Sequence, residues 1–405
     1  MNRTGKRIVI TGAGVASALG NTPEELFENL AAGKSAVRMM NTWPAPVPAA
    51  PLPETPSGME RLSRTERRSM GRVAHLAAIA GLAAFRDSGL DELPSERTAC
   101  VIGSTLGASR VFEETFETLL LGGGREEISP MNFFKCASHT AAFNTANVLH
   151  IGGPVYAPAS ACAAGLQSIG LAAGLLLSGE ADFAVAGGAD ELSHMVAESF
   201  CRMEAYAHPS AGEMPENAAR PFDRNRSGLV CGEGAATVLL EKYEHARKRG
   251  ARIYAEIEAY ATNRGTEQVT QSDSAAVERC FRLLADQAES FDGLGLISAH
   301  ATGTRQGDRA EAEALRRTFG STVPTASLKG QLGHTLGASG ALELIASLEM
   351  MRRGVLLPSA NLSEPAPECA GPDYVREIRE KKFTRFIKDC FAFGGINALM
   401  LCRKM

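Results

Sequence analysis

A single cysteine opens an uncharged stretch in the middle of the chain. Cys162 stands near the start of residues 161–177, where small and apolar residues follow it and no charged side chain occurs. Unpaired backbone N–H groups at a helix start favour negative charge, so a cysteine there is expected to have thiolate character. Most free cysteines, however, are small buried apolar residues without a reaction to perform. Both interpretations stay open until partner residues are found elsewhere.

Two histidines lie in glycine-rich surroundings later in the chain. His300 ends an apolar strand-like segment, and His334 follows Gly333 just before a helical segment. Ligands of α/β sheets bind at the carboxyl ends of strands, and glycines let a backbone approach a substrate closely. A lone histidine is more often a structural residue. One cysteine with two separate histidines nevertheless suits covalent acyl transfer, in which a thiolate forms a thioester and imidazoles handle the proton.

Glycine pairs mark two further turns. Near the C-terminus, Phe393 begins a Phe-Gly-Gly segment after an apolar strand, and such a pair is usually only a turn. Near the N-terminus, Gly12 and Gly14 follow a short strand and invite comparison with a dinucleotide-binding fingerprint. Ser17 replaces the third glycine of that fingerprint, and the next helix begins only after the N-cap Thr22. We therefore expect no cofactor.

The bulk composition excludes several classes of protein. The chain has 405 residues, 44% hydrophobic and 22% charged, with a formal net charge of −4. That charge gives neither a basic surface for nucleic acid nor a polybasic arm for a membrane. Nine cysteines are scattered singly without a C-x-x-C pair, and the N-terminal residues run directly into a strand. The uncharged stretch 161–177 is expected to be a core helix. We expect a cytoplasmic protein with no metal, no nucleic-acid partner and no membrane insertion.

Strand-like and helical segments alternate along the chain. A strand–helix–strand pattern occupies residues 98–186, and the pattern restarts near residue 250. Such alternation argues for a mostly parallel sheet covered by helices. A chain of 405 residues also exceeds a usual single core. We therefore expect an α/β protein of two successive halves, residues 1–250 with the cysteine and residues 251–405 with the two histidines.

The motifs taken together resemble those of a known family. They are Cys162 in Ser-Ala-Cys-Ala-Ala-Gly, His300 in His-Ala-Thr-Gly-Thr, Lys329 followed by the Gly-His pair of His334, and Phe393 in Phe-Gly-Gly-Ile-Asn. This ordered set is similar to that of the β-ketoacyl-acyl-carrier-protein synthases of the KAS I/II type, condensing enzymes of the thiolase superfamily. The resemblance covers essentially the whole chain. It implies the thiolase fold, in which two similar βαβαβ-type halves stack in a five-layer αβαβα arrangement, and a dimer.

The resemblance also implies a role for each residue of the set. Cys162 would be the nucleophile that carries the acyl group, and its backbone N–H together with that of Phe393 would form the oxyanion hole. His300 and His334 would promote loss of CO2 from the malonyl unit. Lys329 would be an electrostatic support beside His334, and Phe393 would gate the passage between the acyl pocket and the malonyl site.

Four further residues would bind the substrate. By family analogy, Thr302 and Thr304 would hydrogen-bond the pantetheine arm. Leu106 and Phe200 fall in the stretches that line the acyl pocket of relatives. The implied reaction is a decarboxylative Claisen condensation with malonyl-acyl carrier protein that yields a 3-oxoacyl-acyl carrier protein. The chain would act on acyl- and malonyl-loaded carrier protein, as a homodimer or as a heterodimer with a chain-length-factor-like paralogue.

Two alternatives remain beside this assignment. A chain-length factor is a non-elongating partner subunit that usually lacks the cysteine, whereas Cys162 is present here. A thiolase-type acyltransferase would need a second active cysteine near the C-terminus, for which Cys390 is the candidate. Departures from the usual motif, including Ala301 and Ala392 in place of glycine, favour a specialised polyene or polyketide pathway over housekeeping fatty acid synthesis. The acyl chain length is left open.

Overall fold

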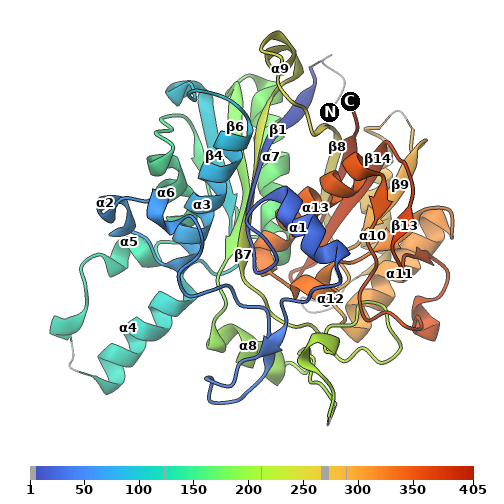
Figure 1. Cartoon of the computed structure of the whole chain (residues 1–405), viewed down its shortest axis with the longest axis horizontal. Coiled ribbons are helices and arrows are strands. Elements are labelled where there is room, and N and C mark those ends of the chain that lie inside the picture. The colour runs from blue at the N-terminus through green and yellow to red at the C-terminus, as the bar shows by residue number, and fades with distance from the viewer. Residues whose placement is uncertain (1–5, 123–124, 211, 266–272, 289) are drawn as a thin grey trace.

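The computed structural model describes residues 6–122, 125–210, 212–265, 273–288 and 290–405. Residues 1–5, part of the N-terminal segment noted above, lie outside the described residues. Helices and sheet strands alternate in layers across the molecule (Figure 1). The two ends of the described chain lie close together, since Arg7 Nη2 is 2.9 Å from Met405 Sδ.

Eleven strands of the described chain form one continuous sheet, in the order β12-β10-β9-β14-β15-β8-β1-β7-β6-β4-β5. The first half contributes β1 (Ile8–Ala16), β4 (Thr98–Gly103), β5 (Val155–Tyr156), β6 (Phe183–Asp190) and β7 (Gly234–Lys242). The second half contributes β8 (Ala255–Arg264), β9 (Leu294–Ser298), β10 (Pro324–Ala326), β12 (Asp373–Tyr374), β14 (Arg385–Ala392) and β15 (Ile396–Arg403). The two sets meet where β1 pairs with β8, over the three residues Ile8 to Ile10.

The strand pairing follows the same sequence in both halves. From the centre outward, β1, β7 and β6 pair antiparallel, and β6, β4 and β5 then pair parallel. In the other direction β8, β15 and β14 pair antiparallel, and β14, β9 and β10 pair parallel. The expectation of a mostly parallel sheet is therefore wrong, because β7 and β15 each run antiparallel to both neighbours. Tight connections such as the β14–β15 turn reverse the chain where a helical crossover would have kept it parallel.

Helices fill three layers around these strands. The helices α7 (Ala164–Ser178) and α13 (Ser339–Arg353) lie between the two halves and belong to the largest apolar cluster. On the outside of the first half, α3 (Arg72–Asp87) and α6 (Thr140–Val148) pack in a second cluster. On the outside of the second half, α10 (Ser274–Ala285) and α11 (Arg305–Phe319) pack in a third. The expected five-layer αβαβα arrangement is confirmed (Figure 1).

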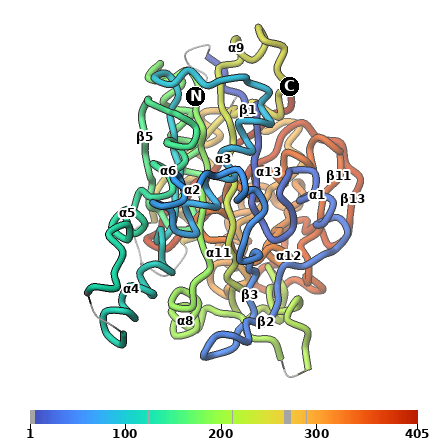
Figure 2. The backbone as a smooth tube through the Cα atoms, turned by 60° about the vertical axis from the view of Figure 1, so that its left-hand side comes forward, coloured from blue at the N-terminus to red at the C-terminus, as the bar shows by residue number. Residues whose placement is uncertain are grey.

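Seven further α-helices and four short strands of the described chain complete the fold. They are α1 (Pro23–Ala31), α2 (Arg64–Arg67), α4 (Ser109–Leu121), α5 (Asn132–Cys136), α8 (His194–Arg202), α9 (Tyr243–Lys248), α12 (Lys329–Leu332), β2 (Arg38–Met39), β3 (Pro48–Ala49), β11 (Val355–Leu356) and β13 (Arg379–Glu380). Figure 2 shows α4 and α5 projecting from one side of the molecule, away from the α12 and α13 region. Thr22 caps α1 as expected, since its side chain accepts a hydrogen bond from the backbone N–H of Glu25.

The uncharged stretch is a core helix. Within the described chain, residues 161–178 form the one helix long and apolar enough to cross a membrane, and 67% of it is buried inside the protein. Apolar residues on every side of a helix are typical of one that is packed all round. Its sequence therefore reflects its position between the two halves.

Three glycines let separate backbones touch beneath the start of α7. They are Gly165 in α7, Gly188 in β6 and Gly337 in the 3₁₀ turn η7 (Leu336–Ala338). A Cβ atom at Gly188 would lie 2.2 Å from the carbonyl oxygen of Gly337, and one at Gly165 would lie 2.5 Å from the same oxygen. Any side chain at these positions would therefore force the layers apart. Gly12 and Gly14 of β1 have the same role against α3, where a Cβ would lie 2.2 and 2.1 Å from carbonyl oxygens.

This close approach predicts a large difference between two glycine substitutions. Gly188→Ala is expected to lower the free energy of unfolding by about 1–3 kcal/mol, because the added methyl group cannot be accommodated. Gly174→Ala is the matched control, since Gly174 lies within α7 with nothing within 4 Å of its would-be Cβ. It should raise stability by up to about 1 kcal/mol, the usual gain of alanine over glycine in a helix. Urea unfolding of both variants measures the difference, and equal stabilities would contradict the packing argument.

Candidate active site

Cys162 lies in a strained turn that leads into α7. The turn is the 3₁₀ segment η5 (Ala161–Ala163), and α7 begins two residues after Cys162, at Ala164. Ala161 adopts a left-handed backbone conformation with φ of 47°, which is unfavourable for a residue with a Cβ atom. Backbone strain of this kind is characteristic of functional sites. The turn leaves the Cys162 side chain 7% exposed at the edge of a cavity.

The structure corrects the expectation that the helix start makes Cys162 a thiolate. Burial raises the pKa of the Cys162 thiol to about 12, and the opposing influence of the Lys329 ammonium is smaller. Removing a thiol from water disfavours its charged form more strongly than the turn stabilises it. The resting residue is therefore a thiol, and its activation needs a base within reach.

His334 provides that base. Its Nε2 lies 2.9 Å from Cys162 Sγ, and its Nδ1 lies 3.0 Å from Ser339 Oγ at the start of α13. The backbone of His334 is fixed on both sides, since its N–H donates to Val230 and its carbonyl accepts from Gly232. Burial lowers the pKa of His334 well below its ordinary value, and the Lys329 and Lys388 ammonium groups lower it further. The imidazole is therefore neutral at physiological pH and able to accept the thiol proton.

His300 lies at the end of β9, beside His334. The two rings are 5.3 Å apart between centroids and nearly perpendicular. The Glu311 carboxylate of α11 accepts the backbone N–H groups of His300, at 2.9 Å, and of Ala301, at 2.8 Å. Burial lowers the pKa of His300 well below its ordinary value, followed by the charges of Lys329 and its neighbours. Both imidazoles are thus kept neutral.

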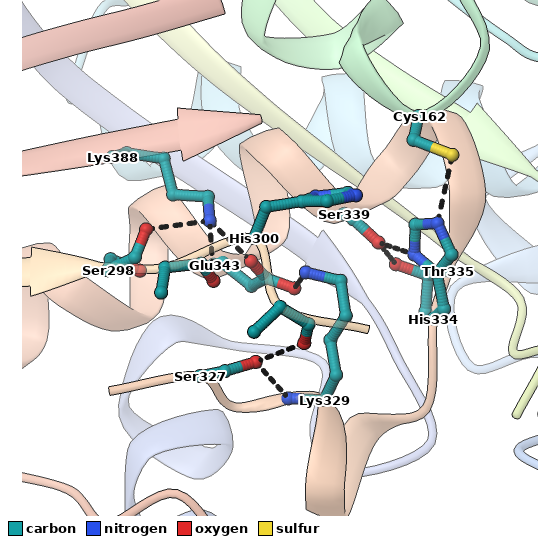
Figure 3. Close-up of polar contacts among 12 residues, drawn as sticks. Cys162, Ser298, His300, Ser327, Lys329, His334, Thr335, Ser339, Glu343 and Lys388 are labelled. Carbon is teal, nitrogen blue, oxygen red and sulfur yellow. Dashed lines mark hydrogen bonds and ion pairs between the residues drawn. The ribbon is translucent and has the colours of Figure 1, made fainter. Parts of the chain in front are cut away.

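A buried cluster of charges lies behind the two histidines. Lys329 pairs with Glu343 at 2.6 Å. The second carboxylate oxygen of Glu343 pairs with Lys388, also at 2.6 Å. Figure 3 shows both lysines pointing at the same carboxylate, with His300 between this cluster and Cys162. None of the three charged side chains is more than 2% exposed.

The reacting groups open into a cavity of about 760 Å³. Cys162, His300 and His334 line it, together with Phe200, Thr302, Thr304, Phe391, Ala392, Phe393 and residues of the 203–205, 227–229 and 305–307 segments. The hydroxyl groups of Thr302 and Thr304 lie 3.1 Å apart on the side of the His300 loop. The Phe393 ring is 38% exposed and stacks on Phe200 at 6.0 Å between centroids.

The structure does not bring every candidate residue to this cavity. Leu106 is 51% exposed in the segment between β4 and α4, and it is not among the described residues that line the cavity. The other eight candidates lie at the cavity or, for Lys329, directly behind it. The acyl-pocket role of Leu106 therefore stays a prediction.

Several residues of the site carry no motif and are missed by sequence reasoning. Ser339 fixes the second nitrogen of His334, and Glu311 fixes the backbone of His300. Asp190 accepts the N–H of Gly337 at 2.6 Å and so holds the turn beside His334. Lys388 offers the one usable signal, because it and Asp389 are adjacent charges inside an otherwise apolar strand segment.

The donor atoms of Cys162, His300 and His334 lie within 4.8 Å of one another, close enough to surround one metal ion. A thiolate and two imidazoles suit zinc. However, the buried ammonium groups of Lys329 and Lys388 lie close to these three side chains, and their positive charge opposes the binding of a metal cation there. The absence of a metal stays a prediction of the sequence, and the proton-transfer geometry is the stronger feature.

The fold and the site together define a class of protein, the cysteine-dependent acyl-transferring enzymes with the thiolase fold. The features that define it are a thiol hydrogen-bonded to an imidazole, a second neutral imidazole beside them and the five-layer α/β arrangement. This chain belongs to the β-ketoacyl synthase family. Residues 5–246 match the model of the β-ketoacyl synthase N-terminal domain, and residues 254–363 match that of the C-terminal domain. The sequence resemblance stated above is confirmed.

Similar proteins cover almost the whole chain. A 3-oxoacyl-[acyl-carrier-protein] synthase 1 of Haemophilus influenzae is 34% identical, with 98% of this chain and 99% of the relative covered. Among solved structures, a β-ketoacyl synthase from Burkholderia phymatum is 38% identical, with a TM-score of 0.93 over 99% of this chain and 100% of that chain. The ishigamide ketosynthase/chain length factor is 29% identical, with a TM-score of 0.91 and 99% of each chain covered. A type II PKS acyl-carrier protein in complex with its ketosynthase gives 26% identity and a TM-score of 0.89, covering 99% of this chain and 100% of that chain.

The electrostatic arrangement predicts the effect of removing Lys329. Lys329→Met is expected to raise the pKa of His300 and of His334, while burial still holds both below their ordinary value, because loss of a nearby positive charge makes each imidazole easier to protonate. Histidine side-chain NMR titration of the ring-labelled protein measures both values. Lys34→Met is the control, since Lys34 is exposed on the surface and pairs with Asn29. Unchanged titration of both rings in Lys329→Met would contradict the assigned cause.

Proposed function

We propose that this protein is a 3-oxoacyl-[acyl-carrier-protein] synthase that joins an enzyme-bound acyl group to malonyl-acyl carrier protein in a decarboxylative Claisen condensation. One observation carries the proposal. The thiol of Cys162 lies 2.9 Å from a neutral imidazole of His334, with the His300 ring beside it, at the edge of a cavity large enough for a pantetheine arm. The relatives support the same reaction type.

The first step transfers the acyl group to Cys162. As Sγ attacks the thioester carbonyl of acyl carrier protein, the thiol proton passes to His334 Nε2. The tetrahedral intermediate collapses and expels the pantetheine thiolate, which takes up that proton. The backbone N–H groups of Cys162 and Phe393 are the donors proposed for the intermediate's oxyanion. One such donor is typically worth about 3 kcal/mol of barrier.

The second step uses both histidines. In the malonyl thioester, the bond between the carboxylate and the α-carbon breaks, CO2 leaves, and the electron pair forms an enolate. His300 supplies an N–H group for the enolate oxygen, and His334 supplies a second one as the tautomer that carries its proton on Nε2, which is free once Cys162 is acylated. The carbanion attacks the Cys162 thioester, and the Cys162 thiolate leaves and takes up a proton from solvent, the one proton that the condensation consumes. Lys329 supports this step through its charge, and Thr302 and Thr304 offer hydroxyl groups to the pantetheine arm.

Partner and pathway follow from the same comparisons. Acyl carrier protein is the proposed carrier of both substrates, and the neighbouring ketosynthase structures include complexes with a carrier protein and with a chain length factor. We propose a dimer, formed with a second copy or with a chain-length-factor-like paralogue. All nine cysteines are free, which suits a reducing cytoplasm. Fatty acid synthesis and a specialised polyene or polyketide pathway both fit this chemistry.

Neither alternative assignment matches the site as well. A non-elongating chain-length-factor role would leave the Cys162–His334 contact without a use. A thiolase-type mechanism needs Cys390 at the reacting centre, but Cys390 is fully buried within β14 and is not among the described residues lining the cavity. Burial also raises the pKa of the Cys390 thiol to about 12.

Two structural halves are proposed for this function, residues 1–250 and 251–405. The repeated strand order supports this boundary, because each half builds the same five-strand pattern beginning from β1 or β8. Cys162 would come from the first half, and His300 and His334 from the second. Catalysis would then require the two halves to be packed against each other.

Intact mass spectrometry after incubation with a panel of acyl carrier proteins tests the nucleophile. The native protein and Cys390→Ala, the matched control, are expected to gain the mass of the acyl group. Cys162→Ala is expected to gain none and to lose condensation to background, because Cys162 is the one cysteine among the described residues that line the cavity. Acylation of Cys162→Ala at the native rate would show that the nucleophile is wrongly assigned.

Substitutions of the two histidines are expected to affect different steps of the reaction. His300→Ala should still acylate Cys162 but lose malonyl-acyl carrier protein decarboxylation by about 100-fold or more, as removal of an oxyanion donor typically does. His334→Ala should slow both steps, since Cys162 loses its base. Release of labelled CO2 from malonyl-acyl carrier protein measures the second step. Equal loss of both steps in the two variants would contradict the division of roles.

A further inference from the structure

Lys388 is a buried charge that the reaction as described does not use. It lies in β14, in the run from Phe386 to Phe391 that is apolar apart from Lys388 and Asp389, and its side chain is fully buried. An ammonium group transferred from water to a protein interior is costly unless it is paired and hydrogen-bonded. A hydrophobic residue at this strand position would avoid that cost. The lysine therefore needs an explanation other than packing.

Three oxygen atoms surround the Lys388 ammonium. It donates to the carbonyl of Ser298 at 2.9 Å and to that of Ala299 at 3.3 Å, and it pairs with Glu343 at 2.6 Å. Burial would lower the pKa of Lys388, but the Glu343 carboxylate and neighbouring groups raise it above its ordinary value. The group is therefore a permanent cation.

The two carbonyl groups belong to the residues immediately before His300. Lys388 thus ties down the end of β9 from inside the central layer. On the outer side, Glu311 binds the N–H groups of His300 and Ala301. Ser327 donates to the carbonyl of Ala301 at 2.8 Å and completes the fixation. Side chains thus hold five backbone groups between residues 298 and 301, namely three carbonyl groups and two N–H groups.

Lys388 also fixes the partner of Lys329. Each lysine takes one oxygen of Glu343, so the carboxylate is held between two ammonium groups (Figure 3). With Lys329 alone, Glu343 would have a free buried oxygen and could turn away. Lys388 therefore determines where Glu343, and through it the Lys329 ammonium, lies relative to His300.

We infer that Lys388 is a positioning residue of the decarboxylation step, because its ammonium ties the strand end that carries His300 and orients the Glu343–Lys329 pair behind it. The inference rests on the proposed condensing function and adds a residue to it. It places Lys388 in the malonyl step. The Cys162–His334 pair performs acyl transfer without contacting Lys388, and burial, the larger cause of the lowered His334 pKa, keeps that imidazole neutral when the Lys388 charge is removed.

The test compares two half-reactions in Lys388→Met, which keeps the side-chain length but removes the charge. We expect kcat of malonyl-acyl carrier protein decarboxylation to fall by roughly 10- to 100-fold, the usual effect of a small misplacement of a reacting group. KM should change by no more than about threefold, since the cavity is untouched, and the rate of Cys162 acylation should stay within the same factor. Lys242→Met is the control, because Lys242 pairs with Asp182 at the far end of β7.

Two further variants separate positioning from folding. Lys388→Ala leaves space for a small cation, so ammonium or methylamine in the buffer should restore part of the lost decarboxylation. Lys388→Gln leaves the buried Lys329–Glu343 pair intact and so buries no charge without a partner. It should remain folded, because its amide can hydrogen-bond in the buried site, and it should still show the selective loss, since no ammonium holds Glu343 and the strand end.

The possible results distinguish a failure of the positioning role from a failure of the proposed function. Native decarboxylation in Lys388→Met, or an equal loss of both half-reactions with no response to ammonium, would overturn the positioning role. If Lys388→Met does not fold, Lys388→Gln decides by the same comparison. A native protein that neither acylates Cys162 nor releases CO2 would instead refute the proposed function on which the inference rests.

Discussion

Exclusion of water from the reacting groups is the constraint on which the rest of this structure depends. Desolvation keeps the Cys162 thiol protonated and both imidazoles neutral, so that a proton can pass between them without a charged resting state. The same burial obliges the charges behind His300 to satisfy one another. Buried ion pairs are weak contributors to stability, since their desolvation offsets much of their attraction. The Lys329–Glu343–Lys388 cluster is therefore better explained by the electrostatics of the site than by the stability of the fold.

The packing of the layers supplies this dry environment. The central helices bring the start of α7 against β6 and the turn beside His334, and glycines at three points of contact allow backbone to touch backbone. Strain in the turn before Cys162 is tolerated because the surrounding layers over-determine it. The site forms where the N-terminal part of the chain, with its thiol, meets the C-terminal part, with its imidazoles. Neither part alone would bury or align these groups.

The local sequence pattern predicted the helices and strands well, but it predicted only in part how the strands pair in the sheet. The uncharged stretch that begins near Cys162 is the core helix that its composition predicts, and Thr22 caps its helix as expected. The prediction of a mostly parallel sheet was wrong because the alternation of strands and helices along the chain does not determine which strands pair, and a tight turn makes β14 and β15 antiparallel. Residues that act through the backbone, such as Glu311 and Ser339, were missed since no residue type or spacing marks a hydrogen bond to a distant main-chain group.

The sequence by itself determined the family, the five-layer fold and the Cys162–His300–His334 set, because these depend on residue types that occur in ordered motifs. Only the tertiary structure decided the protonation state of Cys162, which the helix start alone had suggested would be a thiolate. Desolvation depends on every segment that covers a group, and those segments come from all parts of the chain. The role of Lys388 was decided in the same way. A lysine in a largely apolar strand cannot be assigned a role until the fold brings together the carbonyl groups and the carboxylate around it.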